Sequence, residues 1–517
     1  MSTTAEYLAF LTRSGVRLWV ENGQLRYHAK RGVFSAEELA RLRSRKGEII
    51  AELTTARVPT PDGATTTLAP QAIEAPLSFQ QQWCLKLLEA YPDWRATLSH
   101  TFHLKGAVDS VALKKSLEGI LHMHPSLRTR IVCTSGRWQQ QIESGNGIQL
   151  PTVQVPGESG PERQRNAFAL VRETESRALD PALAPLIAAR LIRLAADEHF
   201  LVVLIHRLSA DCLSVGQIVR DLWVLYAQPT QMGSSVSPDA IARYHDYTLR
   251  QHATDAVWRQ KHTAYWNDYL AGAQPILWPK QEYAAPARRH VPRELESLES
   301  SFGVMLSARL REFGQQTQTL PALVTLSLYV AVLSRWCQQK DLLLPFVIAG
   351  RAASHERIVG CFSHLVYLRI RLDGTETFIE LLKRVSNEYF KAAAFRQDCG
   401  RMVTEKPELL RGTLCQWLSW HPADLAESEP DDQMEQLGLE VENMRCQNLE
   451  ELTNVPPDMV DLEINFFDAD GDISMLAVYR TDRFAKAAPV RLMEKIRSTA
   501  EYAFRDSQVP VADWLPV

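Results

Sequence analysis

The chain has 517 residues, about three times the length of a typical single domain, so two or three compact units are expected. Apolar residues make up 45% of the chain and charged residues 23%, which excludes a disordered, collagen-like or disulfide-scaffold protein. With 57 basic and 61 acidic side chains, the formal net charge of -4 gives no general attraction to nucleic acid or to an anionic membrane.

Cysteine usage and hydropathy predict the compartment. Eight cysteines without a CxxC pair indicate free thiols in a reducing environment. The start, MSTTAEYLAF, lacks the basic and apolar regions of a signal peptide. The most apolar stretch, 322–333, is shorter than the roughly 18 to 20 residues that span a bilayer. We therefore expect a soluble cytoplasmic protein without a membrane or nucleic-acid partner.

The first 53 residues form a small unit of their own, because 54–75 is rich in Thr, Pro and Ala without periodicity and is typical of a linker. Capping-box spacings at 3–6 and 35–38 predict two helices. Between them, Asn22-Gly23 is the preferred turn of a two-residue hairpin. This turn pairs Val20 with Leu25, Leu18 with Tyr27, and Trp19 with Arg26.

Trp19 and Arg26 would then lie on the face opposite the two apolar pairs. An exposed indole beside a cation often marks a recognition surface. The alternative is that Trp19 packs against the second helix.

Strand and helix patterns alternate after the linker, in residues 76–517. This alternation predicts a mixed α/β (α+β) fold with two lobes, about 76–250 and 251–517. In chain order, we expect a strand at 98–104, a helix at 113–121, paired strands at 187–194 and 200–205, a helix at 215–225, a helix at 323–336 and a strand at 342–348.

The strand at 200–205 ends in His206-Arg207-Leu208-Ser209-Ala210-Asp211-Cys212. A loop at a strand end can hold reactive groups on a rigid support. On the residues alone, however, a His and an Asp at a strand-to-helix turn more often serve as capping and hydrogen-bonding groups. No phosphate loop, GxSxG or HExxH motif is present, and the histidines give no plausible metal set.

The first unit resembles the N-terminal β-hairpin docking domains (TubC-type) of nonribosomal peptide synthetase and hybrid polyketide synthase subunits. The resemblance covers 5–53 and rests on LAFLTRSGVRLWVENGQLRYHAKRG and SAEELARLRSRKGEII. It implies a receptor for a short, usually acidic segment at the C-terminus of an upstream subunit, added to the hairpin edge as a strand. The expected contact residues are Arg17, Trp19, Arg26, Lys30, Arg31 and Lys46.

The large region resembles the condensation domain of nonribosomal peptide synthetases over 74–510. Eight motif-like segments occur in the family's order: LSFQQQWCL, MHPSLRT, HRLSADCLS, YHDY, AGR, IVGCFSHLVYLR, RQD and YRTDRF. The resemblance implies a V-shaped pair of chloramphenicol-acetyltransferase-like lobes. It also implies a tunnel at their interface, where donor and acceptor meet on 4′-phosphopantetheine arms of carrier proteins, with no cofactor bound.

The family's HHxxxDG motif is altered at its centre. Its second His, which the resemblance implies assists the acceptor's attack on the donor thioester, is Arg207 here. A guanidinium cannot accept a proton at neutral pH, so Arg207 could stabilise an oxyanion but not act as the base. Asp211 is retained, and the resemblance implies a structural ion pair with Arg128 or Arg351. His206, the first and mostly structural His, could take over a catalytic role.

Other positions depart from the pattern too. Cys212 replaces the motif's Gly, Trp83 the opening Arg, and Arg396 the His of HQD. His206 stands where heterocyclising relatives have Asp, so thiazoline formation is not expected. The motif and tunnel residues implied by the resemblance are Ser209, Cys212, Ser214, Tyr244, Asp246, Arg128, Arg351 and Arg396.

Three functions fit this resemblance. We favour a free-standing, monomeric condensation enzyme that an upstream carrier-protein subunit recruits through its C-terminal motif, and that forms an amide or an ester with a carrier-bound or free acceptor. The second is a non-catalytic platform, because HRLSADC shares its His-Arg start with the condensation-like domains of glycopeptide synthetases, which recruit tailoring oxygenases. A coenzyme A acyltransferase is disfavoured, since the docking domain points to carrier-bound substrates.

Overall fold

The computed structural model describes residues 17–21, 24–28, 46, 73–143, 147–228, 244–253, 256–280, 282–283, 294–418, 434, 437–444, 455–469 and 471–511. The chain divides into two compact units, Met1–Gln71 and Ala72–Val517. The division falls within the predicted linker, 54–75. The finer domain bounds remain predictions.

The first unit contains a hairpin of β1 (Arg17–Glu21) and β2 (Gln24–His28). Its register pairs Leu18 with Tyr27, Trp19 with Arg26, and Val20 with Leu25, which confirms the predicted pairing. Lys46 is helical and exposed. The rest of the two flanking helices, Lys30, Arg31 and the proposed packing of Trp19 on the second helix lie outside the described residues.

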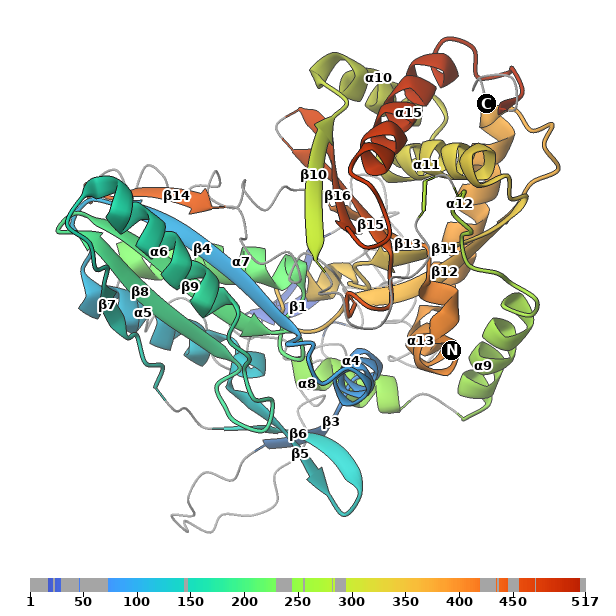
Figure 1. Ribbon diagram of the computed structural model, residues 1–517. Coiled ribbons are helices and arrows are strands. Elements are labelled where there is room, and N and C mark those ends of the chain that lie inside the picture. The colour runs from blue at the N-terminus through green and yellow to red at the C-terminus, as the bar shows by residue number, and fades with distance from the viewer. Residues whose placement is uncertain are drawn as a thin grey trace. The chain divides into compact units, whose positions relative to one another are not determined.

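A five-stranded sheet forms the core of the first lobe of the second unit (Figure 1). Its strand β9 is buried on both faces, because Leu201, Val203 and Ile205 face α5 and α7 while Val202 and Leu204 face α6. The sheet order is β14 (Glu440–Met444), β4 (Thr97–Lys105), β9 (Glu198–His206), β8 (Ile187–Ala195) and β7 (Thr152–Gln154). The helices are α5 (Ser110–Met123), α6 (Gly160–Glu175) and α7 (Cys212–Ala227).

The second lobe is a six-stranded sheet with four helices packed on one face. The apolar helix α11 is buried from Leu323 to Leu333 in the core between this sheet and the helices. The sheet order is β10 (Leu295–Ser301), β16 (Asp472–Arg480), β15 (Leu462–Ala469), β13 (Thr413–Leu418), β11 (Asp341–Ile348) and β12 (His364–Arg371). The helices are α10 (Val304–Gln316), α11 (Pro321–Cys337), α12 (Phe378–Ala394) and α15 (Ala487–Ala503).

A small third sheet and several helices complete the second unit. Helix α4 begins at a capping box of Ser78 and Gln81, and its Cys84 and Leu87 join the core of the second lobe. The remaining elements are β3 (Ile73–Pro76), β6 (Arg137–Ile142), β5 (Thr129–Thr134), α4 (Phe79–Ala90), α8 (Tyr244–His252), α9 (Ala256–Tyr269), α13 (Cys399–Glu405), and the short 3-10 helices η1 (Pro125–Arg128), η3 (Ala353–His355), η4 (Arg396–Asp398) and η5 (Pro407–Leu410).

The strand β14 connects the two lobes. It comes late in the chain yet pairs antiparallel with β4 at the edge of the first lobe's sheet. The Nε2 of His100 on β4 lies 2.8 Å from the Oδ1 of Asn443 on β14. The first lobe is therefore not built from residues 76–250 alone, a long-range pairing that local periodicity does not reveal.

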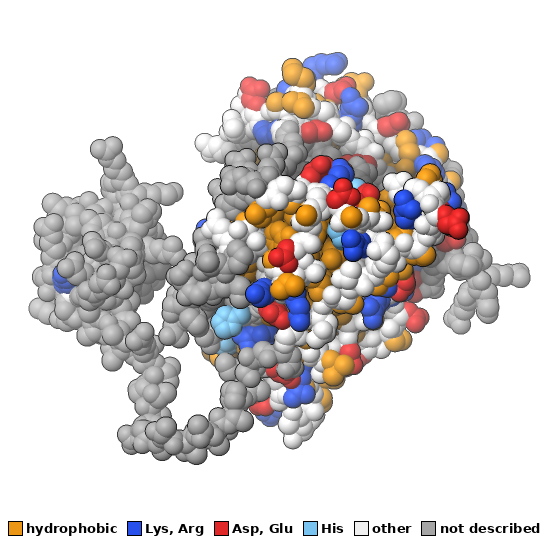
Figure 2. Space-filling view, turned by 90° about the vertical axis from the view of Figure 1, so that its left-hand side faces the viewer, with side chains coloured by type: hydrophobic (Ala, Val, Ile, Leu, Met, Phe, Trp, Pro, Cys, Tyr) orange, Lys and Arg blue, Asp and Glu red, His pale blue; other side chains and the backbone are white. Residues whose placement is uncertain are grey.

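One face of the molecule carries charges of both signs. On the face shown in Figure 2, Lys and Arg side chains are interspersed with Asp and Glu, with hydrophobic side chains between them.

Among the described residues, no single helix is long and apolar enough to cross a bilayer; only α10 and α11 together pass that test, and they are bent by 106°.

Candidate functional site

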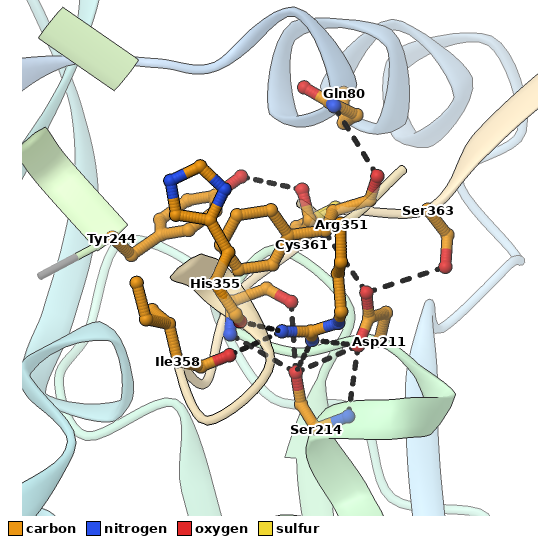
Figure 3. A network of polar contacts seen from close by, with 11 residues as sticks. Gln80, Asp211, Ser214, Tyr244, Arg351, His355, Ile358, Cys361 and Ser363 are labelled. Carbon is orange, nitrogen blue, oxygen red and sulfur yellow. Dashed lines mark hydrogen bonds and ion pairs between the residues drawn. The ribbon is translucent and has the colours of Figure 1, made fainter. Parts of the chain in front are cut away.

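The retained Asp211 caps the N-terminus of α7 and anchors a polar network between the lobes (Figure 3). Its Oδ1 accepts hydrogen bonds from the Ser214 backbone at 2.9 Å and from the Ser214 hydroxyl at 2.8 Å. The same oxygen forms an ion pair with Arg351 Nη2 at 2.6 Å. The side chains of Asp211 and Arg351 are only 4% and 6% exposed, so the charges are nearly withdrawn from water.

Arg351 also holds the backbone of its own lobe, and Asp211 holds backbone of the other lobe. Arg351 Nη1 donates to the carbonyls of His355 and Ile358, at 3.0 and 2.6 Å. The Phe362 backbone N–H donates to the other Asp211 oxygen at 3.1 Å. Removing one partner of such a buried pair typically costs about 3–5 kcal/mol, because the other charge is left uncompensated. The network therefore fixes the β9–α7 turn against residues 351–363.

The other predicted motif residues lie in several places. The Tyr244 hydroxyl donates to the Cys361 carbonyl at 2.6 Å and lies 2.8 Å from Ser78 Oγ, beside the network. Ser209 donates to the His206 carbonyl at 2.8 Å. Asp246 is 45% exposed. Arg128 donates to the Leu121 and Glu143 carbonyls, and Arg396 donates to the Ala393 carbonyl.

His206 is completely buried in the strand-to-helix turn. Its Nδ1 accepts a hydrogen bond from the Leu208 backbone at 3.1 Å, so the ring supports the turn itself. Burial, followed by the nearby charge of Arg207, lowers the pKa of His206 to about 4. The imidazole is therefore neutral at physiological pH.

Arg207 lines a cavity of about 40 Å³ beside the motif. A chamber of about 310 Å³ lies next to it, and the two share Cys212, Val347 and Ser363 in their walls. His206 is not part of either wall. The smaller cavity is lined by Gln80, Trp83, Cys84, Trp94, Arg207, Ala210, Asp211, Cys212, Val347, Cys361, Ser363, His364 and Leu365.

Three cysteine thiols surround the Arg207 cavity. Burial raises the pKa of Cys84 to about 12 and also raises the pKa values of Cys212 and Cys361, while the Arg207 charge partly opposes each rise. The thiols are thus protonated at neutral pH. The sequence interpretation singled out Cys212 but missed Cys84 and Cys361, which come from a helix and a loop far apart in the chain.

His364 is a second imidazole that the sequence interpretation missed. It lines the small cavity, and its Nε2 faces Gln80 Nε2 at 2.5 Å. Burial, followed by the charge of Arg396, lowers the pKa of His364 to about 3, so this ring is neutral too. The residue lay within reach of the sequence interpretation, because His364 is part of the segment IVGCFSHLVYLR that carried the resemblance.

The comparisons show the family of both regions. The family model of the condensation domain matches residues 71–516, and the family model of the TubC N-terminal docking domain matches residues 5–54. The chain therefore belongs to the condensation-domain family and carries a TubC-type docking domain. In nonribosomal peptide synthetases, such domains act on substrates held on phosphopantetheine arms.

Individual relatives are similar over parts of the chain. Chondramide synthase cmdD of Chondromyces crocatus is 25% identical over 427 residues, which cover 79% of this chain and only 10% of that much longer protein. The EpoB cyclization-docking bidomain from Sorangium cellulosum has a TM-score of 0.68 at 18% identity, covering 98% of this chain and all of that one. The X-domain in complex with OxyB from teicoplanin biosynthesis has a TM-score of 0.67 at 20% identity, covering 89% and 98%.

These structures confirm the two-lobed condensation-domain fold. Among the described residues, no cluster of His, Cys, Asp or Glu could hold a metal ion. The candidate site consists of the Asp211–Arg351 network and the chamber beside Arg207 and Cys212.

Proposed function

We propose that the chain transfers an acyl chain from a carrier protein to an amine or hydroxyl acceptor, as a condensation enzyme. The observation that carries this proposal is the placement of Arg207 in the wall of a cavity that shares three residues with the 310 Å³ chamber. The buried Asp211–Arg351 pair holds the turn that bears Arg207.

Arg207 would act as a fixed charge. When the acceptor nitrogen or oxygen attacks the donor thioester, its bond to the carbonyl carbon forms and the carbonyl oxygen becomes negative. A guanidinium facing that oxygen stabilises it, and holding donor and acceptor together supplies several kcal/mol more. Collapse breaks the carbon–sulfur bond, and the proton of the acceptor passes to the leaving thiolate. We assign His206 a structural role, because its ring is fully buried and does not line the cavity.

A non-catalytic platform is the second candidate, and the size of the Arg207 cavity favours it. About 40 Å³ holds little more than one water molecule. The X-domain of teicoplanin biosynthesis, similar in fold, was solved in complex with OxyB. In this alternative, the chain would bind a tailoring enzyme and the tunnel would make no bond.

The docking domain would deliver the substrate in either case. We propose that the hairpin edge receives an acidic C-terminal segment of the upstream carrier subunit, with contacts from Arg17, Trp19, Arg26, Lys30, Arg31 and Lys46. The register places Trp19 opposite Arg26, which supports a joint aromatic and cationic contact.

Intact-protein mass spectrometry of an acyl-loaded carrier protein tests the enzymatic proposal. With candidate amines or alcohols, the native chain should release the acyl group as the matching product. Arg207→Ala should slow release about 100-fold or more, as loss of an oxyanion donor does. His206→Ala tests the structural role of His206 and should lower the melting temperature.

A native chain that releases no product, together with an Arg207→His variant that does, would contradict the enzymatic proposal. That result would favour the platform.

A further inference from the structure

The 310 Å³ chamber lies where the carboxyl ends of β11 and β13 meet the first turn of α11. These two strands are parallel, and the carboxyl ends of parallel strands are a common place for ligands. Leu320, just before α11, is part of the wall and is 54% exposed. The chamber therefore reaches the surface of the second lobe.

The wall of this chamber is mostly apolar. Phe346, Tyr389 and Trp417 contribute aromatic rings, and the centroids of Phe346 and Tyr389 lie 5.9 Å apart in an edge-on arrangement. Ala322 and Leu323 contribute aliphatic surface from α11. A wall of this composition is typical of a site for an apolar ligand group. The residues of the wall that are neither aliphatic nor aromatic are Cys212, Ser363, Gln416 and Asp468.

The wall offers no unpaired charge. Within the part of the chain that the structure describes, Asp468 is its one charged side chain, and that carboxylate is ion-paired with Arg311. Burial raises the pKa values of Cys212 and Tyr389, so both groups stay neutral at physiological pH. A carboxylate or an ammonium group moved from water into the chamber would lose hydration without gaining an opposite charge.

The chamber continues into the site proposed for the reaction. It shares Cys212, Val347 and Ser363 with the cavity that Arg207 lines. A group held in the chamber would therefore lie close to the reacting atoms of the same substrate. The volume of 310 Å³ is twice the roughly 150 Å³ of an apolar cavity that holds one benzene molecule. The chamber thus has room for a large aromatic side chain or an alkyl chain.

We propose that the chamber binds an uncharged apolar group of the substrate, an aromatic side chain or an alkyl chain, while the thioester reacts beside Arg207. Burial of apolar surface against the wall supplies the affinity, and the lack of an unpaired charge excludes acidic and basic groups. The group belongs either to the acyl chain of the donor or to the side chain of the acceptor. The inference rests on the proposed function for the identity of the substrate, and it makes the chamber a specificity site.

The substitution Ala322→Trp tests this role by filling the chamber. Ala322 is half-buried in the first turn of α11 and lines the chamber, so an indole there would take up the space that the apolar group needs. Binding of a large apolar group should weaken about tenfold or more, and binding of a small group should stay the same. Ala487→Trp is the matched control, at an exposed site in the first turn of α15, and should bind both groups as the native chain does.

The experiment measures binding of loaded carrier protein to the full chain by calorimetry, without turnover. A donor series carries a methyl, an octyl or a carboxyheptyl group on the phosphopantetheine sulfur through a thioether. An acceptor series carries glycine, phenylalanine or aspartate through an amide in place of the thioester. In at least one series, the octyl or phenylalanine probe should bind the native chain about tenfold or more tightly than the small and acidic probes. The series that shows this preference identifies the source of the apolar group.

The inference would be overturned if no probe binds, if neither series shows the preference, or if the preference persists in Ala322→Trp. Should Ala322→Trp fail to fold, Ala349→Trp provides the same comparison from an exposed residue of the wall just after β11. Because the probes cannot be transferred, a native chain that prefers the apolar probe but releases no acyl group would contradict the enzymatic proposal alone. Release of product without any such preference would contradict this inference alone.

Discussion

Two buried imidazoles flank the altered motif, and each is held neutral by its surroundings. Their pKa values are lowered to about 4 for His206 and about 3 for His364, from an ordinary value near 6.5. The unfolded chain therefore binds protons at these sites at a higher pH than the folded chain does. Their contribution to stability is fully present above pH 6.5 and is lost as the pH falls toward 4 and 3.

We predict that His364→Asn flattens this dependence. Between about pH 6 and 4, each such histidine steepens the fall of the unfolding free energy by up to about 1.4 kcal/mol per pH unit. Denaturant titrations across this range should show a slope smaller by about one proton in the variant. His122→Asn, at an exposed site on α5, is the control and should run parallel to the native chain. A native-like slope in His364→Asn would contradict the prediction.

Single residues were predictable from the sequence where they belong to a local motif. The motif order led to Asp211, and the two candidate partners included Arg351, which the structure joins to it at 2.6 Å. Sequence could not choose between Arg351 and Arg128, because the choice depends on how the lobes meet. Cys84 and Cys361 were missed for a related reason: they line the Arg207 cavity only because the fold brings distant segments of the chain together.

Elements with strong periodicity were also predicted. The expected strand at 98–104 is β4, the helix at 215–225 is α7, and the helix at 323–336 is α11. The paired strands β8 and β9 were expected as well, and they pair antiparallel. By contrast, β14 has the sequence EVENM, whose charged and polar residues give little strand signal, and its partner β4 lies more than 300 residues earlier.

The attachment of β14 to the first lobe depends on a close approach of two backbones. Gly106 follows β4 with φ +123°, and a Cβ built on it would lie 2.2 Å from the carbonyl oxygen of Gly438, just before β14. We predict that Gly106→Ala displaces β14, raising amide exchange at 440–444 and lowering the unfolding free energy. Because the atoms nearest to the added Cβ all belong to the backbone of Gly438 and Leu439, no flexible side chain can move aside.

Gly136→Ala is the matched control for backbone conformation. Gly136 has φ +75° in the turn between β5 and β6, with nothing within 4 Å of its added Cβ. That variant should lose only about 1–2 kcal/mol, the cost of a left-handed alanine. Equal losses in the two variants, with unchanged exchange at 440–444, would show that the contact with Gly438 does not hold the strand.

At the scale of the whole molecule, the docking hairpin and the condensation domain have separable tasks. A docking segment raises the effective concentration of the tethered carrier protein at the tunnel without adding any contact there. Under the proposed function, binding of the upstream subunit should depend on residues of the first unit, whereas release of the acyl chain should depend on Arg207 and the chamber. In the platform alternative, the second unit would instead bind a tailoring enzyme, and delivery would still depend on the first unit.

We predict that Trp19→Ala or Arg26→Glu weakens binding of the upstream subunit's acidic C-terminal peptide by about tenfold or more, measured by calorimetry on the full chain. The two residues are cross-strand partners in the hairpin register, so each change alters one member of the proposed contact pair. Arg177→Glu makes the same charge change at an exposed site of the second unit and should leave the affinity unaltered. Raising the salt concentration should weaken native binding more than binding to Arg26→Glu, because screening acts on the charge that this variant has already lost. Native-like affinity in both hairpin variants would move the receptor surface to another part of the first unit.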